Sequence, residues 1–240
     1  MIRNLPAIRA YVRKAHLMIL RCAETPIDRT STKLGGVPYL TETDRWPICQ
    51  ACHQPMTFMF QANLSDIPPG DFRIGRHDFL SFYYCLNCQP HGSHEDAGYH
   101  IELRQLERAA ELQTSSFAMH DPDRPEPKEC AVVFRSIDDL PPPEKIVCIL
   151  GAEDEAIEEY EQHVEQVRGG RLEASKIGGY AYWLQTQPTV RCSCGATMRF
   201  LGQIHSNPKF DLLWANNGVL YLLYCPEACT PNSVAFVIQS

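Results

Sequence analysis

The sequence predicts an α+β, sheet-rich and internally duplicated fold, with a zinc-ribbon-like four-cysteine knuckle pair in each half and a few peripheral helices. Three observations support this prediction: cysteines occur in close pairs, short motifs recur at a nearly constant separation, and apolar strand-like runs lead into the later pairs. The chain has 240 residues, and its 44% hydrophobic content is sufficient for a core. This length fits one large domain or two small ones.

Cysteine is the unusual component of the composition, with 11 residues in the chain. Eight of them form four pairs that are close in sequence: Cys49 and Cys52, Cys85 and Cys88, Cys192 and Cys194, and Cys225 and Cys229. About 30 residues separate the first pair from the second, and a similar gap separates the third from the fourth. The order of a pair, a gap and a pair therefore occurs twice.

Other motifs repeat with the cysteines. Lys33-Leu-Gly-Gly matches Lys176-Ile-Gly-Gly at an offset of 143 residues, and later matches keep offsets between 140 and 143. We interpret these matches as two copies of one unit, because a fixed period defines the architecture of a repeat protein. The predicted organisation is one compact body: residues 1–98 with an N-terminal helix and the first repeat (core 32–90), residues 99–174 with connecting strands and an acidic helix, and residues 175–240 with the second repeat.

The spacing of the cysteines indicates metal binding. Zinc in structural sites takes four ligands in a tetrahedron, and two tight turns that each carry two cysteines can supply them. In both units an apolar strand, Phe79–Tyr84 or Val219–Tyr224, runs directly into the second turn. We therefore predict two structural zinc ions, each held by four cysteines, with no coordination position left for a substrate.

Alternatives to zinc remain open from the sequence. The pairs could be reduced surface turns or redox pairs, and an iron–sulfur cluster also uses four thiolates. The second set has less regular spacing, so its assignment depends on its being a repeat of the first. His91, His94 and His100 follow Cys88 and could replace a ligand, although solvated loop histidines are the simpler interpretation. Cys22, Cys130 and Cys148 are expected to be small buried hydrophobes.

The remaining elements follow from hydrophobic periodicity. Residues 101–112 are ambiguous between strand and helix, and residues 92–98 and 122–127 are expected to be loops. An apolar face at Leu5, Ile8, Val12, Ala15 and Ile19 predicts an N-terminal helix, residues 131–134 and 146–150 are expected to be strands, and residues 154–167 to be a helix.

The predicted helix at 154–167 lies in an acidic segment. A concentration of like charge is most simply a solvated face. It could also be a docking surface for a basic partner protein, because complementary charge steers association. The acidic residues are Glu153, Asp154, Glu155, Glu158, Glu159, Glu161 and Glu165.

Composition and missing motifs exclude several functions. A net charge of -7 disfavours binding of nucleic acid by bulk electrostatics. We expect a cytoplasmic protein, because the N-terminus lacks the apolar region of a secretory signal and no apolar run could span a bilayer. Neither a phosphate-binding glycine motif nor a hydrolase or kinase motif is present, so the glycine pairs are expected to have a structural role.

Several motifs resemble the YwqG-like family. The resemblance covers most of the chain in the same order. It implies a bacterial family with an internally duplicated, sheet-rich fold, and some members of that family look like immunity proteins beside polymorphic toxins. The matching segments are 33–39, 46–47 and 60–64 in the first half, and 176–180, 185–188, 201–204 and 214–219 in the second.

This sequence departs from the family pattern at Gln187 and Asn216, where the resemblance implies Asp, and in its cysteine pairs. The combination of Lys-x-Gly-Gly with a following C-x2-C is similar to the eukaryotic relatives of programmed cell death protein two, which act as chaperones for a ribosomal protein. Both resemblances imply protein binding rather than catalysis.

The function predicted from these observations is a non-enzymatic, zinc-stabilised protein-binding module. In one version it is an immunity protein that binds and neutralises a toxin, and in another it is a chaperone-like holder of a basic client. The remaining alternative is an enzyme whose site assembles from scattered residues. A deep polar pocket with a strongly perturbed titratable group would favour that alternative. We expect neither nucleic acid nor membrane as a partner.

Overall fold

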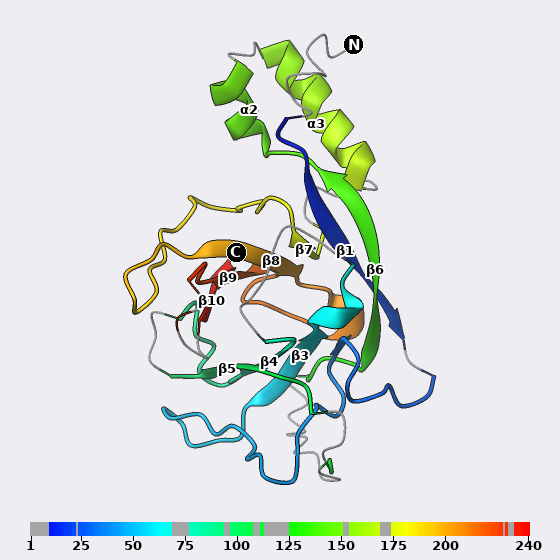
Figure 1. Ribbon diagram of the computed structural model, residues 1–240, viewed down its shortest axis with the longest axis vertical. Helices are drawn as coiled ribbons and strands as arrows, with labels where there is room; N and C mark the ends of the chain where they lie inside the picture. Colours follow the sequence, from blue (N-terminus) through cyan, green and yellow to red (C-terminus); the bar gives the residue numbers. More distant parts are fainter. Residues whose placement is uncertain are drawn as a thin grey trace.

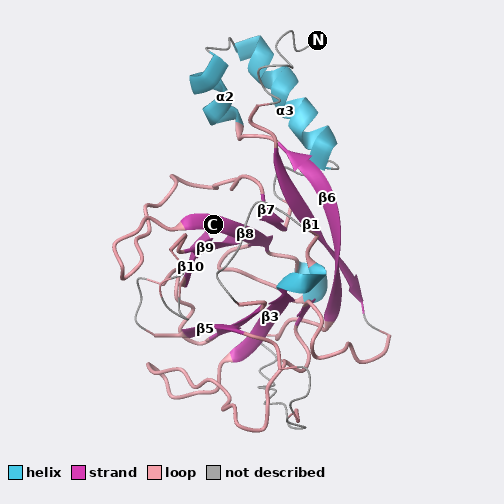
Figure 2. Cartoon of the chain, in the orientation of Figure 1, coloured by secondary structure: helices cyan, strands magenta, loops and turns pink. Residues whose placement is uncertain are grey.

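The architecture is dominated by one antiparallel sheet, as Figures 1 and 2 show for the computed structural model. The structure describes residues 10–22, 24–68, 77–93, 97–107, 111–112, 125–150, 154–168, 174–227, 229 and 233–240. The strands are β1 (Arg13–Cys22), β2 (Lys33–Leu34), β3 (Thr57–Asn63), β4 (Phe79–Tyr84), β5 (Tyr99–Arg104), β6 (Cys130–Asp139), β7 (Lys176–Gly178), β8 (Arg199–His205), β9 (Val219–Tyr224) and β10 (Val234–Gln239). The helices are α2 (Pro143–Leu150) and α3 (Asp154–Arg168), with 3-10 turns at Leu64–Asp66 and Pro208–Phe210.

The ten strands have the order β10-β9-β8-β7-β1-β6-β2-β3-β4-β5, and the sheet curls until it is nearly a barrel. The loop after β4 reaches the opposite edge of the sheet. There the Ser93 N–H donates to the Phe236 carbonyl at 3.0 Å, and the Ile238 N–H donates to the His91 carbonyl at 2.7 Å. These bonds pair part of the β10 edge, which would otherwise be open to pairing with another chain.

The centre of the sheet exchanges strands between the two halves of the chain. The long strands β1 and β6 pair along their whole length, from Arg13 opposite Asp139 to Cys22 opposite Cys130. The short strand β2 then pairs with β6, whereas β7 pairs with β1. With the halves taken as β1–β5 and β6–β10, the second strand of each half pairs with the first strand of the other, so the two halves are interlocked.

The apolar core fills the inside of the curled sheet. In β4, alternate residues Leu80, Phe82 and Tyr84 face this core, as expected for a strand with a two-residue period. Phe82 lies 5.3 Å from Phe236 and 6.0 Å from Trp214 between ring centroids, so aromatic contacts join the two halves. The opposite face of β4 is also buried, which explains why its sequence is mostly apolar.

Helices α2 and α3 lie beyond one end of the β1–β6 pair (Figure 1). They pack through a small separate cluster that contains Ile146, Tyr160 and Val164, with Leu140, the residue directly after β6. The Tyr160 hydroxyl donates to the Pro141 carbonyl at 2.6 Å. The helix expected over residues 154–167 is confirmed as α3. Neither described helix is long and apolar enough to cross a membrane.

The sequence-based strands at 79–84 and 219–224 are confirmed as β4 and β9, and residues 131–134 lie within β6. The ambiguous segment 101–112 begins as strand β5. Loop 122–127 is described only from residue 125, where no helix or strand is formed.

Two sequence-based assignments of secondary structure are wrong. The segment expected to end an N-terminal helix is strand β1 from Arg13 onward, while residues 1–9 lie outside the described residues. Its long pairing with β6 outweighs a helical period that rested on few apolar positions. Residues 146–150, expected to be a strand, belong to helix α2, because a short apolar run does not distinguish the two structures and Pro143 suits the first turn of a helix.

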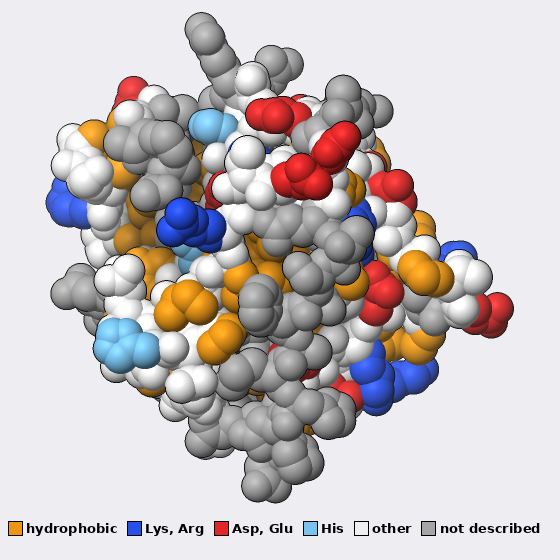
Figure 3. All heavy atoms as spheres, turned by 90° about the horizontal axis from the view of Figure 1, so that it is seen from below, with side chains coloured by type: hydrophobic (Ala, Val, Ile, Leu, Met, Phe, Trp, Pro, Cys, Tyr) orange, Lys and Arg blue, Asp and Glu red, His pale blue; other side chains and the backbone are white. Residues whose placement is uncertain are grey.

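Acidic, basic and hydrophobic side chains are interspersed among the described residues on the face opposite the helices (Figure 3). No single sign of charge covers that described surface. This face therefore lacks the uniform field that steers highly charged partners.

Candidate metal centres

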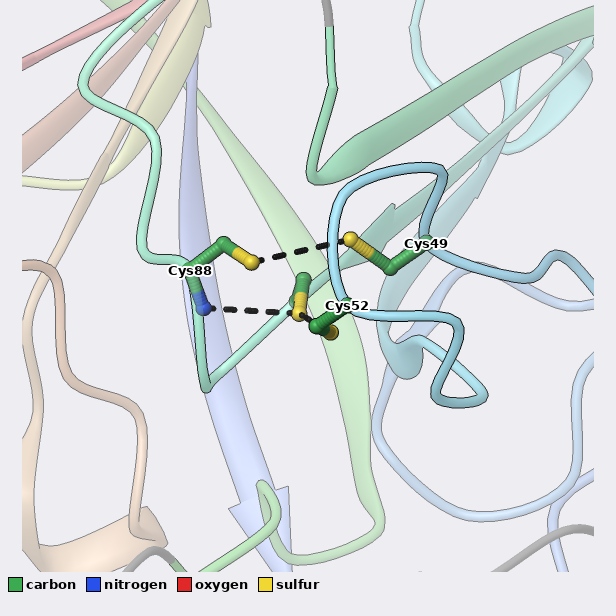
Figure 4. Close-up of side chains that lie close together, drawn as sticks. Cys49, Cys52 and Cys88 are labelled. Atoms are coloured by element: carbon green, nitrogen blue, oxygen red, sulfur yellow. Dashed lines mark hydrogen bonds between the residues drawn. The ribbon is translucent and has the colours of Figure 1, made fainter.

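The first cysteine cluster forms where a hairpin turn meets the end of β4. Cys49 and Cys52 lie in a turn closed by the bridge between Ile48 and Pro55, and Cys85 directly follows β4. The Sγ atoms of Cys49 and Cys88 are 3.7 Å apart, and those of Cys52 and Cys85 are 3.5 Å apart. Figure 4 shows Cys49, Cys52 and Cys88 directed toward one another from the two turns.

The second cluster has the same construction in the other half. Cys192 and Cys194 lie in a turn closed by the bridge between Arg191 and Thr197, and Cys225 directly follows β9. The Sγ atoms of Cys192 and Cys229 are 3.3 Å apart, and those of Cys194 and Cys225 are 3.6 Å apart. The structure thus gathers the eight paired cysteines into two separate clusters of four, as the sequence predicts.

The sulfur separations fit a tetrahedral metal site. With Zn–S bonds near 2.3 Å, the edges of a regular tetrahedron of sulfurs are about 3.8 Å. The measured contacts run from 3.3 to 3.8 Å, and within each cluster all four sulfurs lie within 4.8 Å of one another. These contacts are far longer than the S–S bond of about 2.05 Å in a disulfide. Each cluster could therefore hold a metal ion.

The backbone of each turn is shaped to support a thiolate. Burial opposes ionisation of Cys49, but the N–H groups of Cys52 and Ala51 and the neighbouring thiols lower its pKa to about 7. In the second cluster, the Cys194 N–H and the Cys229 thiol lower the pKa of Cys192 to about 6. A thiolate is the form that binds metal, so both turns favour the ligating state.

Residues with positive φ follow the second cysteine of three pairs and close these turns. They are His53 with φ 58°, Gln89 with φ 47° and Gly195 with φ 88°. Only glycine adopts this conformation freely. A non-glycine residue at two of the positions shows that the surrounding structure imposes the turn.

Cys88 and Cys229 resist ionisation when no cation is close. The pKa of Cys88 is raised to about 12 by burial and by the nearby thiols. The pKa of Cys229 is raised to about 12 mainly by the Cys192 and Cys194 thiols. Four thiolates within such short distances repel one another, and a divalent cation would remove that repulsion.

Each cluster stands on its own small apolar core on the outer side of the sheet. Cys49 and Cys85 pack with Met56, Phe58 and Tyr83. The second cluster packs in the same way on residues that include Met198 and Leu223. The strand face opposite the main core therefore positions the cysteines of each cluster.

The other candidate ligands lie outside the described clusters. His91 and His100 belong to neither, and His94 lies outside the described residues. Among the remaining cysteines, Cys130 is buried as expected, whereas Cys22 is exposed, which corrects the expectation of a core residue. Cys22 is the last residue of β1 and lies opposite Cys130 of β6. The Cys148 side chain is outside the described part of α2.

The repeated Lys-x-Gly-Gly motif has a role that sequence reasoning did not identify. Lys33 and Lys176 are completely buried, and their ammonium groups reach Glu129 at 3.0 Å and Asp139 at 2.5 Å. A Cβ on Gly179 would lie 2.3 Å from Asp139 Oδ2. The glycine pair therefore leaves room for the carboxylate, and the expected structural role of these glycines is confirmed.

Two buried glutamines accompany these lysines. Gln61 lies opposite Lys33 and accepts a hydrogen bond from the Tyr39 N–H at 2.9 Å. Gln203 lies opposite Lys176 and accepts one from the Tyr182 N–H at 2.9 Å. The matched offsets of these residues in the sequence were the available signal for this polar network.

The fold and the two clusters define a sheet-rich protein with two four-cysteine sites that could hold metal. Comparison with protein-family models finds a match over residues 32–230 to a family described as a domain of unknown function (DUF1963). The match covers most of the chain, so the chain belongs to this family. No curated protein matches the chain.

Proposed function

We propose that the protein is a non-enzymatic protein-binding module of the cytoplasm, stabilised by two structural zinc ions. The observation that carries this proposal is that each cluster contains four thiols at tetrahedral separations. Four protein ligands complete the coordination of zinc, whereas catalytic zinc keeps one position for water. The metal then maintains the fold, and function falls to the surface.

Each half of the chain acts in this proposal as a zinc ribbon with a long insert, and the two halves are copies of one unit. The matching hairpin turns, strand ends and lysine–glutamine pairs support the duplication. The YwqG-like proteins that the sequence resembles are members of the matched family, and the cysteine-rich variant is the version to which we assign this chain.

The first test is the metal itself. Zinc measured per chain after dialysis of reduced protein should be two equivalents. Zinc prefers four thiolates at these separations, and both clusters offer them. Bound iron would overturn the assignment of the metal as zinc. Freshly reduced protein that binds no metal would contradict the proposal as a whole.

The partner is proposed to be a basic protein. In the immunity version this partner is a toxin that the module neutralises. The exposed face of helix α3 is the argument for a basic partner. Glu158 and Glu165 are exposed on it, while Tyr160 and Val164 face inward. The acidic side of the helix is thus available at one end of the molecule.

Co-purification of the tagged chain from its native host tests the partner. We expect a stoichiometric basic protein whose recovery falls when Glu158→Lys and Glu165→Lys are combined, because the complementary charge is reversed. Glu24→Lys with Glu42→Lys is the matched control, since both residues are exposed and lie far from α3 in sequence. Recovery of no partner, or equal loss with the control pair, would overturn this proposal.

The chaperone version, in which the client is a basic protein such as a ribosomal protein, rests on the same acidic face. The two versions differ in what the partner does alone. A toxin is active without the module and inhibited by it. A client aggregates without the module and is soluble with it.

A further inference from the structure

A basic cleft lies between the start of β1, helix α2 and the segment that connects β7 to β8. Its volume is about 550 Å³. In Figure 1, α2 stands above the loop that follows β7. Four cationic side chains line the cleft, and its lining contains no carboxylate; the cations are Arg13, Lys14, Lys145 and Arg199.

We propose that this cleft binds a small phosphate-bearing molecule. The cleft is separate from the metal ligands, since no cysteine lines it. It is also separate from the exposed acidic side of α3 to which we assign the protein partner. The proposal therefore does not depend on the function proposed above.

Most of the positive charge in the cleft is not neutralised by the protein. Lys14 forms an ion pair with Asp138 on the neighbouring strand. Arg13, Lys145 and Arg199 form no ion pair with any carboxylate in the described part of the chain. Like charges held near one another in a partly enclosed space favour an anion between them.

Two of these cations are positioned by one aromatic ring. The Arg13 guanidinium carbon lies 4.3 Å from the centre of the Tyr180 ring, and the Lys145 ammonium lies 5.8 Å from it. Contact with the face of a ring orients a cation and leaves its charge in place. Tyr180 thus brings cations from β1 and α2 to the same wall of the cleft.

The ring itself is fixed. Tyr180 is buried, its hydroxyl donates to the Tyr11 carbonyl at 2.5 Å, and its N–H donates to Asp139 at 2.8 Å. Asp139 is in turn paired with the buried Lys176. A rigid floor lowers the entropic cost of binding, because the cations need little ordering when a ligand arrives.

The repeat provides an internal comparison. The sequence offsets place Val37 of the first half at the position of Tyr180, and Thr57 at the position of Arg199. The duplicated unit folds in the first half without these side chains. The ring and the arginine are thus particular to the second half, where both line the cleft, although the chain as a whole has a net charge of -7.

The size and the donors define the ligand. A volume near 550 Å³ lies within the range of about 300–1,000 Å³ for small-molecule sites. The planar guanidinium groups of Arg13 and Arg199 match phosphate oxygens with two parallel hydrogen bonds. Thr189 and Thr197 add hydroxyl donors to the lining. A phosphate ester or diphosphate suits this set.

Titration calorimetry of the full-length, metal-loaded protein at low salt tests the proposal, with pyrophosphate, inorganic phosphate and citrate as probes. We expect saturable binding of one pyrophosphate per chain, tighter than phosphate. Arg13→Gln and Arg199→Thr should each weaken it about tenfold or more, because each removes charge-assisted hydrogen bonds to the phosphate oxygens. Arg135→Gln is the matched control, because Arg135 is exposed on β6 and does not line the cleft.

Three outcomes would overturn the proposal. Pyrophosphate could fail to saturate at millimolar concentration, or Arg135→Gln could weaken binding as much as Arg199→Thr. Citrate could also bind as tightly as pyrophosphate, which would assign the cleft to polycarboxylates. Unchanged far-UV circular dichroism and zinc content of each variant separate loss of binding from loss of fold.

Discussion

Lys33 and Lys176 make corresponding ion pairs that differ in their burial. The Lys176 and Asp139 side chains are both fully buried, whereas Glu129, the partner of Lys33, is 27% exposed. Removal of one partner from a buried pair leaves an uncompensated charge. The exposed fraction of the carboxylate therefore decides how much each pair contributes to stability.

We expect Asp139→Ala to lower the free energy of unfolding by about 3–5 kcal/mol, because Lys176 would keep a buried charge without a partner. Glu129→Ala should cost less, since water can reach the Lys33 ammonium once the partly exposed carboxylate is removed. Denaturant unfolding of both variants measures the difference. Equal losses would show that burial of the carboxylate does not control the strength of the pair.

His16 should make stability depend on pH. Burial and the nearby Lys14 lower its pKa below the usual 6.5. The unfolded chain therefore binds a proton more readily than the folded one, and stability falls as pH drops below 6.5. His16→Gln should remove this contribution to the pH dependence of the free energy of unfolding between pH 7 and 5, which denaturant unfolding at each pH measures. If the wild type and the variant follow the same pH curve, His16 does not contribute.

At the scale of the element, each four-cysteine cluster depends on a turn and a strand end that are distant in sequence. Cys49 is completely buried and sits on a small core separate from the interior of the sheet. A structural zinc site contributes on the order of 10 kcal/mol to folding of small domains. That magnitude is comparable to the total stability of a domain.

Cys49→Ala should therefore reduce bound zinc from two equivalents to one and unfold the turns of the first cluster. Cys192→Ala should do the same in the second half. Cys22→Ala is the control, because Cys22 is exposed and lies outside both clusters. Elemental analysis with hydrogen exchange measures the effect, and two equivalents of zinc in Cys49→Ala would refute the assignment.

At the scale of the whole molecule, the exchange of β2 and β7 across the central β1–β6 pair joins the halves. Backbone pairing continues through the centre without interruption. The aromatic contacts of Phe82 with Trp214 and Phe236 add apolar burial across the same boundary. The two halves are therefore expected to fold as one cooperative unit.

A protease site inserted between Leu112 and Pro125 tests this interlocking. After cleavage the two fragments should remain together on size exclusion, because each carries strands that the other needs. They should separate only in denaturant. Fragments that separate in native buffer would show that the exchanged strands do not hold the halves together.

The sequence by itself determined the cysteine pairs, strands β4 and β9, and helix α3. These features depend on neighbours in the chain, so spacing and periodicity are sufficient to predict them. It failed for Arg13–Cys22 and for residues 146–150, because a short apolar segment fits a helix or a strand until its partners are known.

Only the tertiary structure decided the exchange of strands, the pairing of Lys176 with Asp139, and the basic cleft. Asp139 accepts a hydrogen bond from Lys176, 37 residues further along the chain, and the cleft brings Arg13 and Arg199 together although they are far apart in sequence. Contacts at such separations leave no local period in the sequence. Their energies come from burial and from charge in a low-dielectric interior, and both depend on the finished fold.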